Sequence, residues 1–319
     1  MKIILIGQAL FGKDCLEALI EQGEEVVGVM TIPDDPTGKP NPLKAFAAEK
    51  NIPIFQPPGK SPNRLKDPQV IEIAKDLKPD LFVLAFVSDI IPYTVIKMAK
   101  QGAINYHPSL LPKYRGGSAI NWAIINGEHQ TGVTIHYVDE AVDAGDIILQ
   151  EKVTITPTDT VGSVYYDQLY PLGVRLIAEA VELIRKGIAP RIPQDQKKAT
   201  YQPIITENDV AIDWHDSSET IVNLIRGANP SPGAHTVFRS QKLKIWEAQI
   251  FESSLESDPG EVGQVINNQG FTVGTANGSI LIKKVQNQGK TKVSAAQFVE
   301  ALNIKSGEYL FSSMNRAEE

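Results

Sequence analysis

Residues 2–30 read KIILIGQALFGKDCLEALIEQGEEVVGVM. The apolar run Lys2–Ile6 ends at Gly7, the apolar residues of Phe11–Gln22 recur at helical spacing, and Glu25–Met30 is apolar again. A strand, a helix and a second strand in this order, with each strand apolar, are typical of a parallel sheet that helices cover on both faces. We therefore expect an α/β domain with a Rossmann-like, mostly parallel sheet.

The same alternation continues through the first half of the chain. The expected elements are a helix at Leu43–Lys50, a strand at Leu81–Ala85, a helix beginning near Pro92, a strand at Ala103–Tyr106, a helix at Ser118–Asn126, strands at Thr131–Tyr137 and Ile147–Val153, and a long amphipathic helix at Thr160–Lys186. Ligands of such sheets bind beyond the carboxyl ends of the strands, so polar residues directly after a strand are candidate site residues.

The second half has a different pattern. Residues 190–206 hold three prolines and three Lys or Arg with little apolar periodicity, which is typical of a linker. Asp216–Glu219 resembles a capping box, and strand-like runs follow at Lys242–Phe251, Gly263–Ile266, Phe271–Thr275 and Ser279–Val285. We expect a catalytic α/β domain at 1–189, a linker at 190–206 and a small antiparallel β-barrel at 207–319.

The composition limits the classes of protein. The chain has 319 residues, of which 42% are hydrophobic and 22% charged, with a formal charge of −7, as in ordinary soluble globular proteins. A single cysteine, Cys15, excludes an intramolecular disulfide and a cysteine-based zinc site. No stretch approaches the ~20 apolar residues of a membrane span, and the N-terminal apolar run is too short for a signal peptide. We expect a cytoplasmic protein with no membrane partner.

Candidate catalytic residues lie between Gly102 and Asp146, where the sequence reads GAINYHPSLLPKYRGGSAINW and, further on, VDEAVDAGD. Asn105 and His107 are one residue apart at the end of a strand, and Asp143 follows in a loop between two strands. An imidazole exchanges protons near neutral pH, an amide donates to a carbonyl oxygen that becomes negative, and a carboxylate orients the imidazole. These groups supply what acyl transfer to an amine requires; a hydrogen-bonded structural histidine is the alternative.

Other candidate sites are weaker. The loop Gly7–Gly12 follows a strand and opens a helix, but Ala9 stands where a dinucleotide motif needs its middle glycine, so we exclude a nicotinamide cofactor. No cluster of residues has metal-ligand spacing, and we expect no metal. His136 lies in a predicted strand, and we expect it to be structural.

The candidate segment resembles the active-site signature of the folate-dependent formyltransferases, which reads Asn-x-His, then Ser-Leu-Leu-Pro, then Arg-Gly, then Asp-x-Gly. The matching residues are Asn105, His107, Ser109–Pro112, Arg115–Gly116 and Asp143–Gly145, and the separation of His107 and Asp143 by 36 positions also matches the family. The resemblance covers nearly the whole chain. It implies a Rossmann-like formyltransferase domain followed by a small barrel.

The resemblance also implies a donor and residue roles. The donor would be 10-formyltetrahydrofolate. His107 would act as general acid and base and stabilise the tetrahedral oxyanion, Asn105 would donate a second hydrogen bond to it, and Asp143 would keep the imidazole charged and oriented. The residues expected to contact the folate are Phe86, Val87, Asp89, Ile90, Ile91, Ser109, Leu110, Leu111, Pro112, Val138, Asp139, Glu140 and Ala141.

The acceptor is open between branches of the family. One is the methionyl-tRNA formyltransferases, and the other is the hydrolase domain of 10-formyltetrahydrofolate dehydrogenase, which uses water. Asn105 favours the transferase branch, because this position is commonly apolar in the other. From Glu207 onward the chain has 10 Lys or Arg against 14 Asp or Glu, whereas a tRNA-binding face is usually basic. A nucleotide-sugar amine as acceptor, or a folate- or RNA-binding protein without turnover, are further alternatives. We expect a monomer that formylates initiator methionyl-tRNA.

Overall fold

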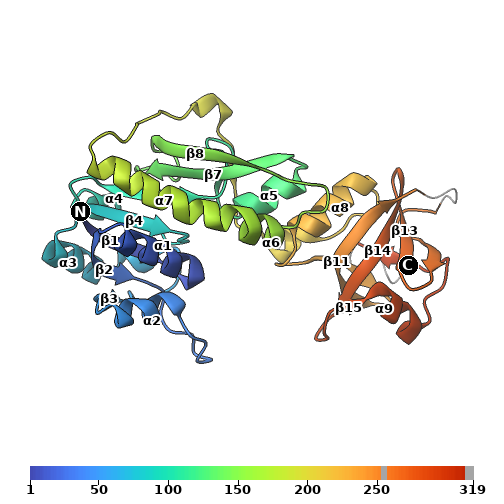
Figure 1. Cartoon of the computed structure of the whole chain (residues 1–319). Coiled ribbons are helices and arrows are strands. Elements are labelled where there is room, and N and C mark those ends of the chain that lie inside the picture. The colour runs from blue at the N-terminus through green and yellow to red at the C-terminus, as the bar shows by residue number, and fades with distance from the viewer. Residues whose placement is uncertain (253–256, 313–319) are drawn as a thin grey trace. The chain divides into compact units, whose positions relative to one another are not determined.

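The computed structural model describes residues 1–252 and 257–312 (Figure 1). Its contacts divide the chain into two compact units. Unit 1 comprises Met1–Ala119, Thr131–Val153 and Tyr166–Gln202, and unit 2 comprises Ile120–Gln130, Thr154–Tyr165 and Pro203–Glu319. Two segments that we expected to belong to the N-terminal domain, 120–130 and 154–165, therefore pack with the C-terminal residues.

Unit 1 is built on a seven-stranded sheet in the order β3-β2-β1-β4-β5-β7-β8. Its strands are β1 Lys2–Gly7, β2 Glu25–Met30, β3 Ile54–Phe55, β4 Leu81–Ala85, β5 Ala103–His107, β7 Gln130–Tyr137 and β8 Ile147–Thr154. The first five are parallel to one another, and β7 is antiparallel to β5. The predicted fold class, a Rossmann-like and mostly parallel sheet, is confirmed. The strand order reverses at β1, so the carboxyl ends of β1 and β4 mark the ligand-binding edge.

Helices cover this sheet, and α7 crosses in front of it in Figure 1. The helices of unit 1 are α1 Ala9–Glu21, α2 Pro42–Glu49, α3 Pro68–Leu77, α4 Tyr93–Ile96 and α7 Tyr170–Arg185. The side chains of Asn41 and Asp67 cap α2 and α3 by accepting from backbone N–H groups, and each helix starts with proline. The single helix predicted at 160–186 is instead α6 Val161–Ser163, a π-helical segment at Val164–Leu169 and then α7.

The alternation of side chains along β5 places the site. Tyr106 is buried, and its ring packs against Phe11 of α1 with a centroid distance of 4.6 Å. A Cβ on Gly173 of α7 would lie 2.3 Å from the Tyr106 ring, so only glycine allows this close approach. Because successive residues of a strand point to opposite faces, Asn105 and His107 share the other face.

Unit 2 holds an antiparallel sheet in the order β12-β13-β14-β11-β10-β16, with β15 paired to β14. Its strands are β10 Ala234–Phe238, β11 Gln241–Phe251, β12 Val262–Ile266, β13 Gly270–Thr275, β14 Gly278–Asn287, β15 Val293–Ser294 and β16 Leu310–Phe311. An isolated bridge joins Glu261, before β12, to Tyr309, before β16. The two edges of the sheet thus meet, and the prediction of a small antiparallel β-barrel is confirmed in the form of a curled antiparallel sheet.

The longer helices that accompany this sheet in the described part of the chain are α5 Ala119–Ile125, α8 Ser218–Gly227 and α9 Ala295–Leu302. The indole of Trp214 lies in the core, and its Nε1 donates to Thr236 Oγ1 at 3.0 Å. Asn121 of α5 donates to the carbonyl of Gly227 in α8 at 2.8 Å, so the two helices pack together.

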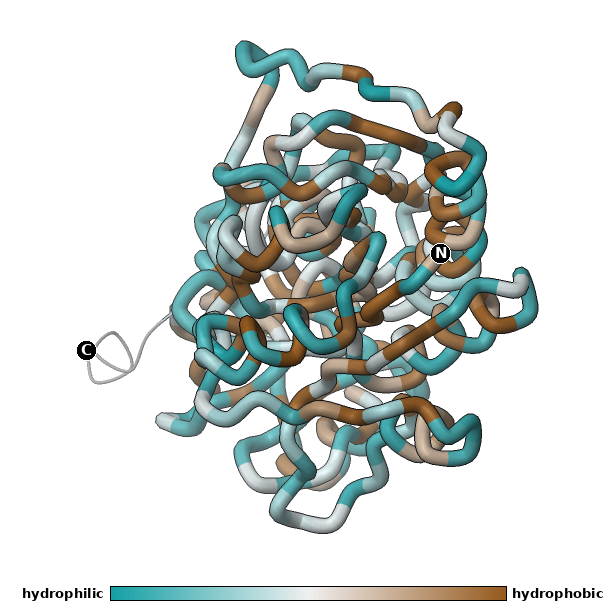
Figure 2. The backbone as a smooth tube through the Cα atoms, turned by 90° about the vertical axis from the view of Figure 1, so that its left-hand side faces the viewer, coloured by the Kyte–Doolittle hydropathy of each residue, from teal (hydrophilic) through white to brown (hydrophobic). Residues whose placement is uncertain are grey.

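In Figure 2 the most hydrophobic residues lie mainly on inner segments of the chain and the hydrophilic ones on outer turns. Within the described ranges, no helix has both the length and the apolarity needed to cross a membrane.

Candidate active site

The three candidate catalytic side chains meet at the carboxyl end of β5. Asn105 and His107 belong to β5, and Asp143 lies between β7 and β8. Asp143 Oδ2 is 3.5 Å from His107 Nδ1, and Asn105 Nδ2 donates to Asp143 Oδ1 at 3.4 Å. The side chains of His107 and Asp143 are only 5% and 12% exposed. The amide, the imidazole and the carboxylate therefore lie close enough to act on one small molecule.

The imidazole of His107 has one nitrogen fixed and one facing the site. Its Nε2–H donates to the carbonyl oxygen of Tyr114 at 2.7 Å, which leaves Nδ1 toward Asp143. Burial lowers the pKa of His107 below its ordinary value of 6.5, and this effect outweighs the raising effects of Asp143 and of the bond to Tyr114. Burial thus disfavours the charged ring and Asp143 favours it, and the expectation that Asp143 keeps the imidazole charged stays a prediction.

The carboxylate of Asp143 is stabilised in its ionised form. Burial by itself raises its pKa, but the nearby imidazoles of His107 and His136 and the N–H of Gly116, which donates to Oδ2 at 2.9 Å, together hold the pKa well below its usual range. The backbone of Asp143 has φ +51°, in the left-handed region. Two residues on, a Cβ on Gly145 would lie 1.9 Å from the carbonyl oxygen of Tyr137, so the turn requires glycine there.

The structure adds His136 to this cluster. Its Nδ1–H donates to the Tyr137 carbonyl at 2.7 Å, and its Nε2 accepts from Asn105 Nδ2 at 3.2 Å and lies 3.6 Å from Asp143 Oδ1. We expected a structural residue, whereas the ring contacts two candidate catalytic side chains. The cause is the antiparallel register that pairs residue 136 directly with residue 105, which the strand pattern alone does not reveal.

Comparison with known proteins identifies the family. Residues 1–181 match the family model described as formyl transferase, and residues 204–303 match the one described as formyl transferase, C-terminal domain. The chain belongs to the formyl transferase family. The resemblance found in the sequence is thereby confirmed, and so is the expectation that the protein is an enzyme of this family.

The similarity of this formyl transferase to its relatives extends over nearly its whole length. It is 39% identical to the methionyl-tRNA formyltransferase of Syntrophus aciditrophicus, with 97% of this chain and 99% of that one covered. It is also 39% identical to the cytosolic 10-formyltetrahydrofolate dehydrogenase of Xenopus tropicalis, with 99% of this chain but 36% of that one covered. Among solved structures, HypX from Aquifex aeolicus in complex with tetrahydrofolic acid has the same fold, with a TM-score of 0.67 and 21% identity over 97% of this chain and 48% of that one.

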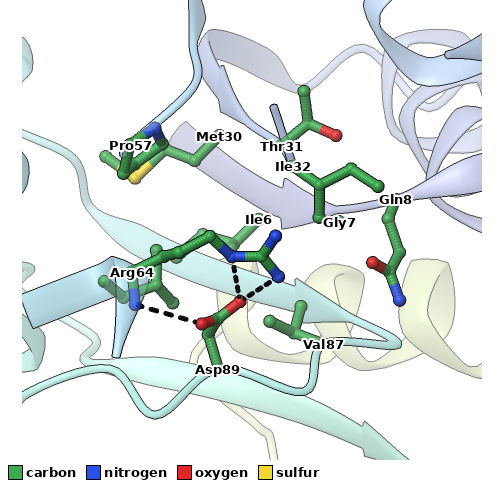
Figure 3. Close-up of a pocket in the computed structure, with 11 residues that line it drawn as sticks. Ile6, Gly7, Gln8, Met30, Thr31, Ile32, Pro57, Arg64, Val87 and Asp89 are labelled. Atoms are coloured by element: carbon green, nitrogen blue, oxygen red, sulfur yellow. Dashed lines mark hydrogen bonds and ion pairs between the residues drawn. The ribbon is translucent and has the colours of Figure 1, made fainter. Parts of the chain in front are cut away.

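Two of the residues expected to contact folate line a pocket of the formyl transferase (Figure 3). Val87 and Asp89 lie there beside residues from the carboxyl ends of β1 and β2, among them Gly7, Gln8, Met30 and Thr31. Figure 3 shows Arg64 reaching Asp89, and its Nε donates to Asp89 Oδ2 at 2.9 Å. The carboxylate of Asp89 is therefore bound to Arg64, which leaves its main chain rather than its side chain for a ligand.

The other residues expected to contact folate differ in their exposure to solvent. Phe86 and Ile90 are 36% and 47% exposed, and Phe86 has a left-handed backbone with φ +59°, a strain typical of functional segments. Ile91, Ser109 and Leu111 are buried, and Ile91 belongs to the core of the sheet. The remaining residues of the set are at least partly exposed: Leu110, Pro112, Val138, Asp139, Glu140 and Ala141. The buried three therefore offer little accessible surface to a ligand.

Proposed function

We propose that this formyl transferase moves the formyl group of 10-formyltetrahydrofolate to the α-amino group of initiator methionyl-tRNA. The observation that carries the proposal is the meeting of Asn105, His107 and Asp143 in one largely buried cluster at the ligand-binding edge of the sheet. The methionyl-tRNA formyltransferases, at 39–40% identity over almost their whole length, support the acceptor. The reaction needs neither a metal nor a nicotinamide.

Bond formation begins when the amine attacks the formyl carbon, which places a negative charge on the formyl oxygen. Asn105 Nδ2 carries two hydrogens, of which one is bonded to His136 at 3.2 Å and the other makes only a long contact of 3.4 Å with Asp143. The second hydrogen is the one available to the oxyanion. A well-aimed donor of this kind contributes about 3 kcal/mol to transition-state stabilisation.

Proton transfer is the task of His107. Its Nδ1 takes the proton that the attacking amine loses, and the resulting imidazolium lies 3.5 Å from the Asp143 carboxylate, which stabilises it. The bond between the formyl carbon and N10 of the folate then breaks, and the proton passes from His107 to N10. The products are the N-formylated amine and tetrahydrofolate, and the proton count balances.

The pH dependence of kcat/KM follows from the protonation of His107, whose pKa burial lowers. The protonated ring cannot accept the amine proton, so kcat/KM rises as the pH increases through the pKa of His107. Because burial lowers that pKa, we expect this rise below pH 6.5. The test is a profile of kcat/KM from about pH 5 to pH 8, with NMR titration of the His107 ring in parallel because the acceptor amine also titrates. A His107 pKa above 6.5 contradicts the assignment.

The acceptor is tested by supplying 10-formyltetrahydrofolate with charged initiator methionyl-tRNA, with the same tRNA uncharged, or with water alone. We expect tetrahydrofolate release to depend on the charged tRNA and to match the amount of formylmethionyl-tRNA formed. The second candidate is hydrolysis, which the 39% identity to the Xenopus dehydrogenase favours. Equal release in all three reactions, without formylated tRNA, supports the hydrolase.

A further inference from the structure

Residues 190–206 have the composition of a linker, yet Gln194 is buried within unit 1 beside the turn that carries Asp143. Its side-chain Nε2 donates to the carbonyl oxygen of Asp143 at 2.9 Å and to that of Gly145 at 2.7 Å. The residue is 7% exposed. One amide group therefore ties together both ends of the three-residue turn.

The orientation of this amide is fixed by Arg115, whose side chain is fully buried. Arg115 donates to Gln194 Oε1 through Nε at 3.1 Å and through Nη2 at 2.6 Å. A guanidinium only donates and a carbonyl only accepts, so the oxygen of Gln194 must face Arg115 and its NH₂ must face the turn. The Gln194 side chain thus has partners on both ends, and a flip would break every one of these bonds.

Arg115 is in turn placed by the backbone around it. Strand β6 Arg115–Gly116 pairs in parallel with β9 Tyr201–Gln202, and Arg115 N–H donates to the carbonyl of Thr200 at 2.9 Å. The next N–H along β6, that of Gly116, donates to Asp143 Oδ2. The same short strand thus holds Asp143 directly at its carboxylate and, through Gln194, at its backbone.

We propose that Gln194 is a positioning residue for formyl transfer. It maintains the left-handed backbone of Asp143, and so keeps the carboxylate facing His107, without itself touching the substrate. The inference rests on the proposed function, because it assigns Gln194 to the proton-transfer step. The linker-like segment is then part of the catalytic unit.

The sharpest test compares the same substitution at two neighbouring glutamines. In Gln194→Glu the oxygen toward Arg115 is kept, but a carboxylate oxygen replaces the NH₂ that binds the two carbonyls. Gln196→Glu is the matched control: Gln196 Oε1 also accepts from Arg115, at 2.9 Å, but its NH₂ donates to the carbonyl of Gln194 and not to the turn. We expect kcat to fall at least about tenfold in Gln194→Glu, with KM for the folate within about twofold of wild type and Gln196→Glu close to wild type in both.

A neutral second variant, Gln194→Met, gives a readout that a purely structural role would not move. The charge of Asp143 raises the pKa of His107, so this pKa falls if the carboxylate turns away. The rise of kcat/KM with pH then shifts to lower pH. NMR titration of His107 measures this shift without substrate, so it remains valid if the tRNA is not the acceptor. Turnover is followed as tetrahydrofolate release with charged tRNA and with water.

The results separate the two hypotheses. A reduced kcat with a lowered His107 pKa supports the positioning role, whichever acceptor the enzyme uses. Wild-type kcat in Gln194→Glu, or an unchanged His107 pKa in Gln194→Met, overturns it. If the wild type does not formylate the tRNA, but the pKa of His107 is still lowered in Gln194→Met, only the proposed function is overturned.

Discussion

Replacing His107 by alanine lowers kcat by at least about a thousandfold, because the substitution removes both the proton acceptor and a cation that stabilises the oxyanion. Its Nδ1 is the ring nitrogen that faces the site, since Nε2–H is bonded to Tyr114. Single-turnover release of tetrahydrofolate measures the loss, and KM for the folate should change little. Such a pattern shows that the lost interaction belongs to the transition state.

Because His107 is buried, a folding control is required. His107→Gln retains an amide N–H that can donate to Tyr114 but has no basic nitrogen, so we expect it to melt closer to wild type and to be almost as inactive as His107→Ala. Appreciable turnover in a folded His107→Gln protein would remove His107 from the proton-transfer step.

Asp143→Asn is expected to lower kcat by roughly a hundredfold or more. An asparagine oxygen can still accept from the Gly116 N–H, but the charge that stabilises the imidazolium is lost. The same loss lowers the pKa of His107, since Asp143 raises it in the wild type. Two independent readouts, kcat and the NMR titration of His107, should therefore change together.

Asp146→Asn supplies the matched control, because it makes the same change in the same loop at a carboxylate that pairs with Arg191 instead. We expect nearly wild-type turnover from it. Acidification distinguishes the two positions further: a carboxylate with a lowered pKa stabilises the fold above its ordinary pKa, and that stability is lost as the pH falls. Wild type should thus lose more stability in acid than Asp143→Asn. An active Asp143→Asn enzyme with an unshifted His107 would refute the role of the carboxylate.

The central residues of the site could be predicted because their positions depend on local rules. Asn105 and His107 alternate with the buried Tyr106 at the end of a strand, and Asp143 follows another strand in a short turn. These patterns determine which face and which edge of the sheet a side chain occupies. The resemblance of these residues to the family signature then indicates formyl transfer as the reaction.

The supporting residues could not be predicted, because their positions depend on contacts distant in the sequence. His136 reaches Asn105 only through the pairing of β5 with β7, and periodicity indicates a strand without naming its neighbour. Gln194 lies among prolines and charged residues, as an exposed linker would, and only contacts distant in the sequence, with the buried Arg115 79 positions away and with the carbonyls of Asp143 and Gly145, make it an interior residue. The lowering of the His107 pKa by burial could not be predicted for a similar reason, because burial is a property of the folded chain.

The division of the chain into two units also limits how this enzyme can be recombined. The backbone passes between the units after residues 119, 130, 153, 165 and 202, and α5 packs against α8 although some 90 residues separate them. A chimera made with one crossover near Gln202 would combine α5 of one parent with α8 of another and mismatch their contact at Gly227. We expect a chimera of two relatives to fold only when residues 120–130 and 154–165 come from the same parent as the C-terminal barrel.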